Sequence, residues 1–338
     1  MMPETLKDVG EFALIHRIDA LLKREGVQAP GVTLGIGDDT ASFRSRPGFE
    51  ILVTCDCVVE GRHFLLPHIS FRDLGSRSMM LNISDIGAMG GHPLYALISL
   101  GLKNETLVKD IEDLYRGFLS ELKPFGASII GGNLTKSGNG IFIDITLIGE
   151  VEEGRAVRRS GARPGDVILV TGYPGHSAAG LQLLLQSLAR EDHPLVRAYN
   201  KPSHRAREGR AVARTLSATA MIDTSDGFLG DLGHICEESR VGALLFQEKF
   251  PISDELKKAA KTLNKEPHEF FLGDSDDYQL IITCPATALH RIRSAVAATY
   301  DGPLTEVGRV TEPEKGIRLL LADGSERPIS AKGWDHFR

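Results

Sequence analysis

The sequence has few cysteines and lacks the marks of secreted and membrane proteins. Its four cysteines, in 338 residues, are too few for a disulfide framework. No apolar run reaches the ~18 residues that a membrane helix needs. Residues 1–26 mix acids into a helical pattern, whereas a signal peptide has a basic start and an apolar centre. We therefore expect a protein of the reducing cytoplasm that has no membrane partner.

Basic runs and the common nucleotide-binding motifs are also missing. The formal net charge is −6, and without a basic run nucleic acid is an unsuitable partner. The sequence contains no G-x-x-x-x-G-K-[ST] motif and no G-x-G-x-x-G after a strand, and it lacks the H-R-D and D-F-G pair of protein kinases. Walker-type NTPases, Rossmann dehydrogenases and protein kinases are excluded.

What is present indicates a globular protein of two domains. Hydrophobic residues make up 42% and charged residues 25% of a chain that is too long for one small core. Strand and helix patterns alternate irregularly in both halves, which favours an α+β fold with mixed sheets over a strict parallel array. We expect domains at 1–150 and 151–338.

Hydrophobic periodicity predicts the main elements. Strands are expected at 50–61, 93–102, 140–151 and within 159–172, and 127–137 is expected to be a strand followed by a loop. Helices are expected at 5–25, from Asp73 to the glycines at 90 and 91, at 105–123 and at 174–189, and 190–209 is a polar stretch.

Carboxylates gather where the fold does not require them. Asp223, Asp226 and Asp231 lie where a buried strand passes into a helix, with Gly227 between them. Asp85 falls on or near the apolar stripe of its helix, so it is either salt-bridged, for example to Arg77, or a metal ligand. The other acids are Asp38 and Asp39, which could be only a solvated turn, and Asp56, which shares a strand face with Thr54.

Oxygen ligands without neighbouring histidine or cysteine suit Mg²⁺, which usually also binds phosphates. Two like charges ~4 Å apart cost on the order of 4 kcal/mol at a surface dielectric. These acids and a nucleotide therefore share a site only if metal ions neutralise them. Cys55 and Cys57 lie on one strand face, and with no further ligands evident nearby we interpret them as packing residues.

A series of motifs in order along the chain resembles the thiamine-monophosphate kinase family, whose superfamily includes aminoimidazole ribonucleotide synthetase, selenophosphate synthetase and a hydrogenase maturation factor. The matching segments are GEFALI (10–15), GIGDDTA (35–41), CDCVVEGRHF (55–64), NISDIGAMGGHPLYALISLGL (82–102), GGNLTKS (131–137), RSGARPGDVILVTG (159–172), IDTSDGFLGDLGHI (222–235) and GWDHF (333–337).

The resemblance implies two α/β domains, of which the first pairs with its twin in a homodimer, with ATP and several Mg²⁺ ions in a cleft between the domains. The second domain would complete the nucleotide and substrate site. The implied metal ligands are Asp38, Thr54, the carbonyl of Cys55, Asp56, Asp85, Asn133, Asp223 and Asp226. The implied ATP contacts are Tyr115, Gly132, Asn133, Arg159 and Ser225, and those to thiamine phosphate are His63, Asp276 and Trp334.

The implied reaction is direct in-line transfer of the γ-phosphoryl group of ATP to thiamine phosphate, which gives thiamine diphosphate. The acceptor is an ionised phosphate, so no side chain is needed as a general base, and positioning and metal ions would supply the catalysis. Trp334 would stack on the substrate, and its alternative role is C-terminal packing.

Several positions depart from the family pattern. Asn133 replaces a common aspartate, although its amide still offers an oxygen to Mg²⁺. The segment GDSDDYQL (273–280) stands where the family has G-G-E-D-Y-E-L. The residues expected to contact the acceptor therefore differ from the family pattern more than those expected to contact ATP. Two alternatives therefore stay open: another ATP-dependent enzyme of the superfamily with a different acceptor, or a nucleotide-binding relative without turnover. His176 and His204 also stand where the family usually has aspartate and proline.

Overall fold

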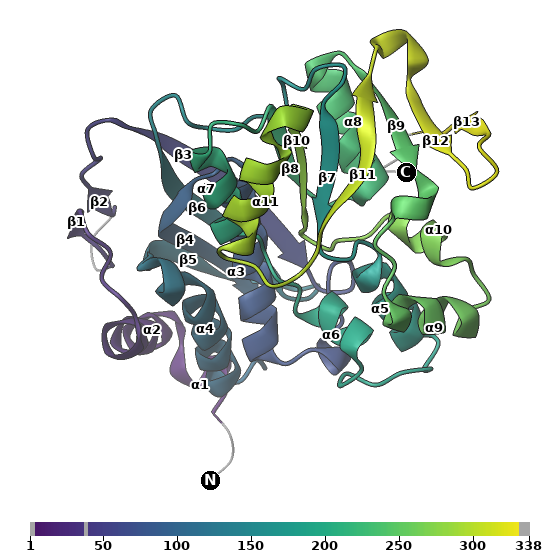
Figure 1. The fold of residues 1–338 in the computed structure, drawn as a ribbon. Helices are drawn as coiled ribbons and strands as arrows, with labels where there is room; N and C mark the ends of the chain where they lie inside the picture. Colours follow the sequence, from purple (N-terminus) through teal and green to yellow (C-terminus); the bar gives the residue numbers. More distant parts are fainter. Residues whose placement is uncertain (1–3, 37–39, 331–338) are drawn as a thin grey trace. The chain divides into compact units, whose positions relative to one another are not determined.

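The structure, a computed structural model, describes residues 4–36 and 40–330 (Figure 1). It divides into two compact units. Unit 1 comprises the described residues up to Ile86 together with Gly91–Gly154, and unit 2 comprises Gly87–Gly90 and the described residues from Arg155 onward. Asp38 and Trp334, which the sequence analysis places in the site, lie outside the described residues.

Unit 1 is built on a four-stranded mixed sheet in the order β3-β6-β4-β5. β6 is antiparallel to both β3 and β4, whereas β4 and β5 are parallel. A separate pair, β1 and β2, is antiparallel. The strands are β1 (Val32–Leu34), β2 (Ser42–Phe43), β3 (Phe49–Val59), β4 (His92–Leu102), β5 (Ser128–Lys136) and β6 (Phe142–Glu152).

Alternation along β3 separates a buried face from an open one, as the sequence predicts. Leu52 and Val58 are 9% and 3% exposed, whereas Val53, pointing the other way, is 64% exposed. Thr54 and Asp56 share the face of Leu52 and are partly buried. Side chains on this face of the strand are therefore held by the interior of unit 1.

The helices of unit 1 pack closely through glycine. A Cβ on Gly75 would lie 2.0 Å from the carbonyl oxygen of Leu114, and one on Gly117 would lie 2.1 Å from that of Arg72, so α3 and α4 approach backbone to backbone. The helices are α1 (Leu6–Val9), α2 (Glu11–Glu25), α3 (Phe71–Ala88) and α4 (Val108–Leu122).

Two predictions for unit 1 were wrong in detail. The single helix expected at 5–25 is interrupted at Gly10, whose φ of 74° lies in the left-handed region that glycine tolerates. The loop expected after residue 130 is instead a continuation of β5, which pairs with β4 from Leu97↔Gly131 to Leu102↔Lys136. Pairing with a neighbouring strand outweighs the loop preference of the two glycines.

Unit 2 is built on a seven-stranded sheet in the order β13-β12-β9-β11-β7-β10-β8. Neighbouring strands are antiparallel except for the parallel pair β9 and β12. The strands are β7 (Val167–Thr171), β8 (Ala220–Asp223), β9 (Gly242–Phe246), β10 (Leu280–Cys284), β11 (Leu304–Thr311), β12 (Ile317–Leu320) and β13 (Glu326–Pro328).

Helices cover both faces of this sheet. Ile168 and Val170 of β7 join the cluster that contains Leu232, and Val167 and Leu169 join the one that contains Val212. Helix α8 therefore lies on one face and α7 and α11 on the other (Figure 1). The helices are α5 (His176–Leu185), α6 (Pro194–Asn200), α7 (Ala206–Arg214), α8 (Phe228–Ser239), α9 (Asp254–Thr262), α10 (Pro267–Leu272) and α11 (Leu289–Ala297).

The polar stretch at 190–209 contains more regular structure than its composition indicates. It includes α6 and the start of α7, and the buried residues Leu195, Val196 and Tyr199 anchor α6. The predicted mixed α+β fold of two domains is confirmed. No helix in residues 4–36 and 40–330 combines the length and the apolar character needed to cross a membrane.

Candidate active site

The acidic turn of unit 2 lies between β8 and α8. β8 is buried along its whole length and ends at Asp223, which pairs with Leu280 and is 2% exposed. Thr224 follows with no exposed surface, and α8 begins after Gly227. Gly227 has a φ of 107°, and a Cβ there would lie 2.4 Å from the carbonyl oxygen of Gly273. The chain therefore turns tightly here and delivers Asp223 and Asp226 at the end of a strand.

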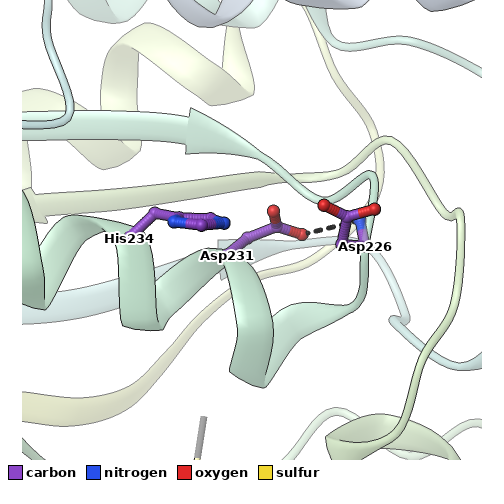
Figure 2. A group of neighbouring side chains, drawn as sticks. All are labelled: Asp226, Asp231 and His234. Atoms are coloured by element: carbon purple, nitrogen blue, oxygen red, sulfur yellow. Dashed lines mark hydrogen bonds between the residues drawn. The ribbon is translucent and has the colours of Figure 1, made fainter. Parts of the chain in front are cut away.

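Asp226 is joined by two further groups from α8, as Figure 2 shows. Ligand atoms of Asp226, Asp231 and His234 all lie within 4.8 Å of one another. The backbone N–H of Asp226 donates to Oδ2 of Asp231 at 3.1 Å. Sequence reasoning noted Asp231 but did not count it in the site. The signal that could have found it is its place in the first turn of the helix that follows the acidic turn.

The electrostatics of this group favour a bound cation. Burial, followed by the charges of Asp223 and Asp226, raises the pKa of Asp231 to about 8. The nearby Arg159 acts in the opposite direction on that pKa, so its guanidinium lies within electrostatic reach. Carboxylate oxygens that repel one another when ionised are ligands that a hard divalent cation would neutralise, and Mg²⁺ suits them.

A second polar group lies in unit 1, where β3 meets α3. The hydroxyl of Thr54 donates a short hydrogen bond to the carboxylate of Asp85. Asp85 is partly buried in a helix whose neighbouring positions are buried, and Asp56 lies on the same strand face as Thr54. The structure therefore brings together Thr54 and Asp85, which the sequence analysis names as metal ligands from distant segments.

Gly132 and Asn133 lie in β5 at the edge of the same sheet. Gly132 pairs with Ile98, and a Cβ on it would lie only 2.0 Å from the carbonyl oxygen of Ile98. Any side chain at this position would push β5 away from β4. Asn133 pairs with Ser99 and is exposed, which leaves its amide free to contact a ligand.

The expected substrate residues have defined local partners. Nδ1 of His63 accepts the backbone N–H of Val59 at 3.0 Å, which fixes the ring in the turn after β3. Asp276 lies in the Gly273–Gln279 loop of unit 2, where the hydroxyl of Ser177 donates to its Oδ1 at 2.5 Å.

Tyr115 occupies an interior position. It is 4% exposed in α4, its ring meets that of Phe118 edge to face at 5.3 Å, and burial raises the pKa of its phenol. The contact that the structure gives it is packing within unit 1. Ser225, in contrast, is partly exposed beside Asp226.

Cys55 and Cys57 are exposed on the open face of the sheet. The thiol of Cys55 lies 3.3 Å from Oδ1 of Asp144 and 3.7 Å from the hydroxyl of Thr146, both on β6. The prediction that these cysteines pack is wrong for the single chain, because alternation places them on the face opposite Leu52.

Residues of the Gly273–Gln279 loop, both altered and unaltered, form hydrogen bonds within unit 2. Oε1 of Gln279 accepts from Nε of Arg205 at 2.9 Å and from the hydroxyl of Thr171 at 3.1 Å. The carboxylate of Asp277 accepts the backbone N–H groups of Gly175 at 2.5 Å and Ser177 at 2.9 Å. Burial raises the pKa of Asp277 to about 6.

The two unusual histidines are partly buried and partnered. His176 lies 2.7 Å from the hydroxyl of Ser253 and stacks on Tyr173, and Nδ1 of His204 accepts the backbone N–H of Ala206 at 3.2 Å. Burial lowers the pKa of each imidazole to about 4, so both are neutral at pH 7.

Comparison with known proteins agrees with this arrangement. Residues 37–151 match the N-terminal domain of AIR synthase related proteins, and residues 163–319 match the C-terminal domain. The fold and the acidic turns therefore belong to the class of AIR synthase related proteins.

Within that class the chain belongs to the thiamine-monophosphate kinase family. It is 32% identical to the Bacillus subtilis thiamine-monophosphate kinase, over 97% of this chain and 99% of that protein. The crystal structure of the Stenotrophomonas maltophilia enzyme superimposes with a TM-score of 0.81 at 31% identity, covering 94% of this chain and 97% of that one. A structure of AaThiL complexed with AMPPCP and TMP gives a TM-score of 0.75 at 35% identity and covers both chains completely.

Proposed function

We propose that the protein catalyses ATP-dependent phosphorylation of thiamine phosphate to thiamine diphosphate, with ADP as the other product. One observation carries the proposal: full-length similarity, at 35% identity, to a protein whose structure holds AMPPCP and TMP together. AMPPCP is an analogue of ATP, so that complex holds the two reactants that a thiamine-phosphate kinase requires.

Mg²⁺ is the metal that we assign, because the ligands are carboxylates, an amide and a hydroxyl. The residues that would hold several ions are Asp38, Thr54, the carbonyl of Cys55, Asp56, Asp85, Asn133, Asp223 and Asp226. The crowding of Asp226 and Asp231, with burial and the charge of Asp223, supports this assignment because a cation would relieve their repulsion. When bound, Mg²⁺ would neutralise charge on the triphosphate and in the transition state.

The protein's own groups bind and orient the reactants. Gly132 keeps β5 close to β4, because a Cβ there would meet the carbonyl oxygen of Ile98, and Asn133 presents an exposed amide beside it. Arg159 and Ser225 would contact ATP. Tyr115 is buried in α4, so we assign it to packing within unit 1 and not to direct contact with ATP. Because the attacking oxygen belongs to an ionised phosphate, no side chain is assigned as general base.

His63, Asp276 and Trp334 are assigned to thiamine phosphate. A carboxylate suits the cationic thiazolium ring or the amino group of the pyrimidine, and an aromatic ring suits stacking, worth roughly 0.5–2 kcal/mol. The contact between Ser177 and Asp276 supports a defined orientation for that carboxylate.

We also propose that the protein is a cytoplasmic homodimer that associates through the open face of the unit 1 sheet. Ile51 and Val53 are 40% and 64% exposed there, with Cys55 and Cys57 on the same face. Aliphatic side chains in a row on one sheet face are a typical contact surface. The test is light scattering of Val53→Asp, with Leu188→Asp, at a half-exposed leucine of unit 2, as the control. A wild-type monomer, or a dimer unchanged by Val53→Asp, contradicts the proposal.

The function is tested by ADP release from the purified protein with ATP and Mg²⁺, with and without thiamine phosphate, and by chromatography of the products. The expected result is thiamine diphosphate formed in step with ADP, and none after chelation of Mg²⁺. ATP binding without stimulation by thiamine phosphate would contradict the assigned acceptor and favour another acceptor within the superfamily.

A further inference from the structure

The Gly273–Gln279 loop is fastened to the first turn of α5. Asp277 accepts the backbone N–H groups of Gly175 and Ser177, and the hydroxyl of Ser275 accepts that of Ala178 at 3.1 Å. The first N–H groups of a helix have no acceptor within the helix, so the loop supplies the acceptor oxygens that they need. The loop and the helix start therefore form one rigid unit.

Ser177 stands at the centre of this contact. Its side chain has no exposed surface, its backbone is bonded to Asp277, and its hydroxyl donates to Oδ1 of Asp276 at 2.5 Å. A hydrogen bond to a carboxylate is stronger and more directional than one between neutral groups. Asp276 itself is only partly buried, so it is accessible to a ligand.

The other end of the loop is held as firmly. Tyr278 has a φ of 53°, a left-handed conformation that is unfavourable for an aromatic residue. Its N–H donates to the carbonyl oxygen of Thr224 at 2.8 Å, and the N–H of Gln279 donates to the hydroxyl of Thr224 at 2.9 Å. Such strain persists where surrounding contacts over-determine the backbone, as they do at ligand-binding loops.

We propose that Ser177 is a positioning residue for the acceptor: it holds the carboxylate of Asp276 in the orientation that receives thiamine phosphate. The proposal rests on the proposed function and deepens it, because it names the residue that orients the substrate contact. The hydroxyl of Ser177 acts through Asp276, to which it donates its hydrogen bond. Its removal therefore affects acceptor binding and leaves ATP binding intact.

A double-mutant cycle tests this dependence. Ser177→Ala, Asp276→Ala and the double variant are compared with wild type for KM of thiamine phosphate, KM of ATP and kcat. Ser177→Ala is expected to raise KM for thiamine phosphate by roughly 10-fold, and by at most about 150-fold, the range for loss of a hydrogen bond to a charged group. KM for ATP should stay within about twofold. In the Asp276→Ala background, Ser177→Ala should raise the KM for thiamine phosphate by less than about a further twofold.

Two results would overturn the proposal. In the first, the fold-changes in KM for thiamine phosphate that the two single substitutions cause multiply in the double variant. Ser177 would then act independently of Asp276. The other is equal loss of affinity for ATP and acceptor, which would indicate a general structural role. Ser217→Ala, at a hydroxyl bonded to Thr215 far along the chain from the loop, is the matched control. If Ser177→Ala fails to fold, Ser177→Cys conserves the volume with a weaker donor and enters the same cycle.

Failure of the proposed function is recognised separately. If wild-type protein forms no thiamine diphosphate, the assigned acceptor is wrong. If wild type turns over and the cycle is additive, only the role of Ser177 is wrong.

Discussion

Replacing the buried acid Asp277 by asparagine should remove a loss of stability that the wild-type protein undergoes as pH rises. Both carboxylate oxygens accept backbone N–H groups at the start of α5, so removal of such a helix-capping acid is ordinarily expected to destabilise. Burial is nevertheless the largest influence on this group and raises its pKa to about 6 from 3.8. The donors from Ser275, Ser177 and Gly175 offset that effect only in part.

The sign follows from proton linkage. Because the pKa is higher in the folded than in the unfolded state, the folded protein binds the proton more tightly. The free energy of unfolding therefore falls as pH rises from 3.8 through about 6, and the loss is complete above that value. At about 1.4 kcal/mol for each pH unit between the two values, the loss amounts to about 3 kcal/mol. The asparagine side chain of the variant does not titrate, so the variant avoids this loss. Its Nδ2 cannot accept the N–H that the second carboxylate oxygen accepts, which costs about 1–3 kcal/mol at every pH.

The assay is urea unfolding followed by circular dichroism, for wild type and Asp277→Asn, at pH 4.5 and pH 8. The free energy of unfolding of the variant, relative to that of wild type, should rise by about 2 kcal/mol between pH 4.5 and pH 8, because only the wild-type carboxyl loses its proton over that interval. Asp274→Asn, at an exposed position of the same loop, is the control for removal of a carboxylate. A relative free energy that is independent of pH, or that falls as pH rises, would refute the reasoning.

Three further predictions concern single side chains. Asp85→Asn should nearly abolish kinase activity at saturating Mg²⁺, because it removes a charge from the assigned metal site, and wild-type turnover would contradict that assignment. Gly132→Ala should weaken ATP binding in calorimetry and lower the melting temperature, because its Cβ would lie 2.0 Å from a backbone oxygen. Gln279→Leu should lower the free energy of unfolding by roughly 1–3 kcal/mol in urea, since Nε of Arg205 and the hydroxyl of Thr171 lose their acceptor. An unchanged stability would mean that water or another group replaces it.

The sequence alone predicts those parts of the site that depend on local pattern. Alternation assigns Thr54 and Asp56 to the inner face of β3, and helical periodicity assigns Asp85 to the inner side of α3, where the structure joins it to Thr54. The acidic turn after β8 is equally visible, because strand, carboxylates, glycine and helix follow one another within a few residues. Each of these assignments uses only the pattern of its own strand, turn or helix, although the bond between Thr54 and Asp85 joins residues 31 positions apart.

What could not be predicted depends on contacts between distant segments. Gln279 and Asp277 form hydrogen bonds with residues about one hundred positions earlier in the chain, and no local sequence pattern predicts these bonds. The extension of β5 through Gly131 arises from pairing with β4. Strand preferences of single residues do not include this pairing, so they do not predict the extension. Val53 is a further example. Its apolar side chain predicts burial, but the sequence does not say whether its own chain or a second chain covers it, and within this chain it is exposed.

The loop that looks most altered in sequence is thus among the most constrained in structure. Replacing glycine by Ser275 removes backbone freedom, yet the new hydroxyl accepts an N–H at the start of α5. Thr224 then links the loop to the acidic turn: its backbone N–H and carbonyl bond Gln279 and Tyr278, and its hydroxyl accepts a third hydrogen bond. Asp223 and Asp226 flank this threonine, so a shift of the loop would move the backbone that carries both carboxylates. In the proposed function, acceptor recognition and metal binding are therefore linked through Thr224, by hydrogen bonds to backbone atoms of Tyr278 and Gln279.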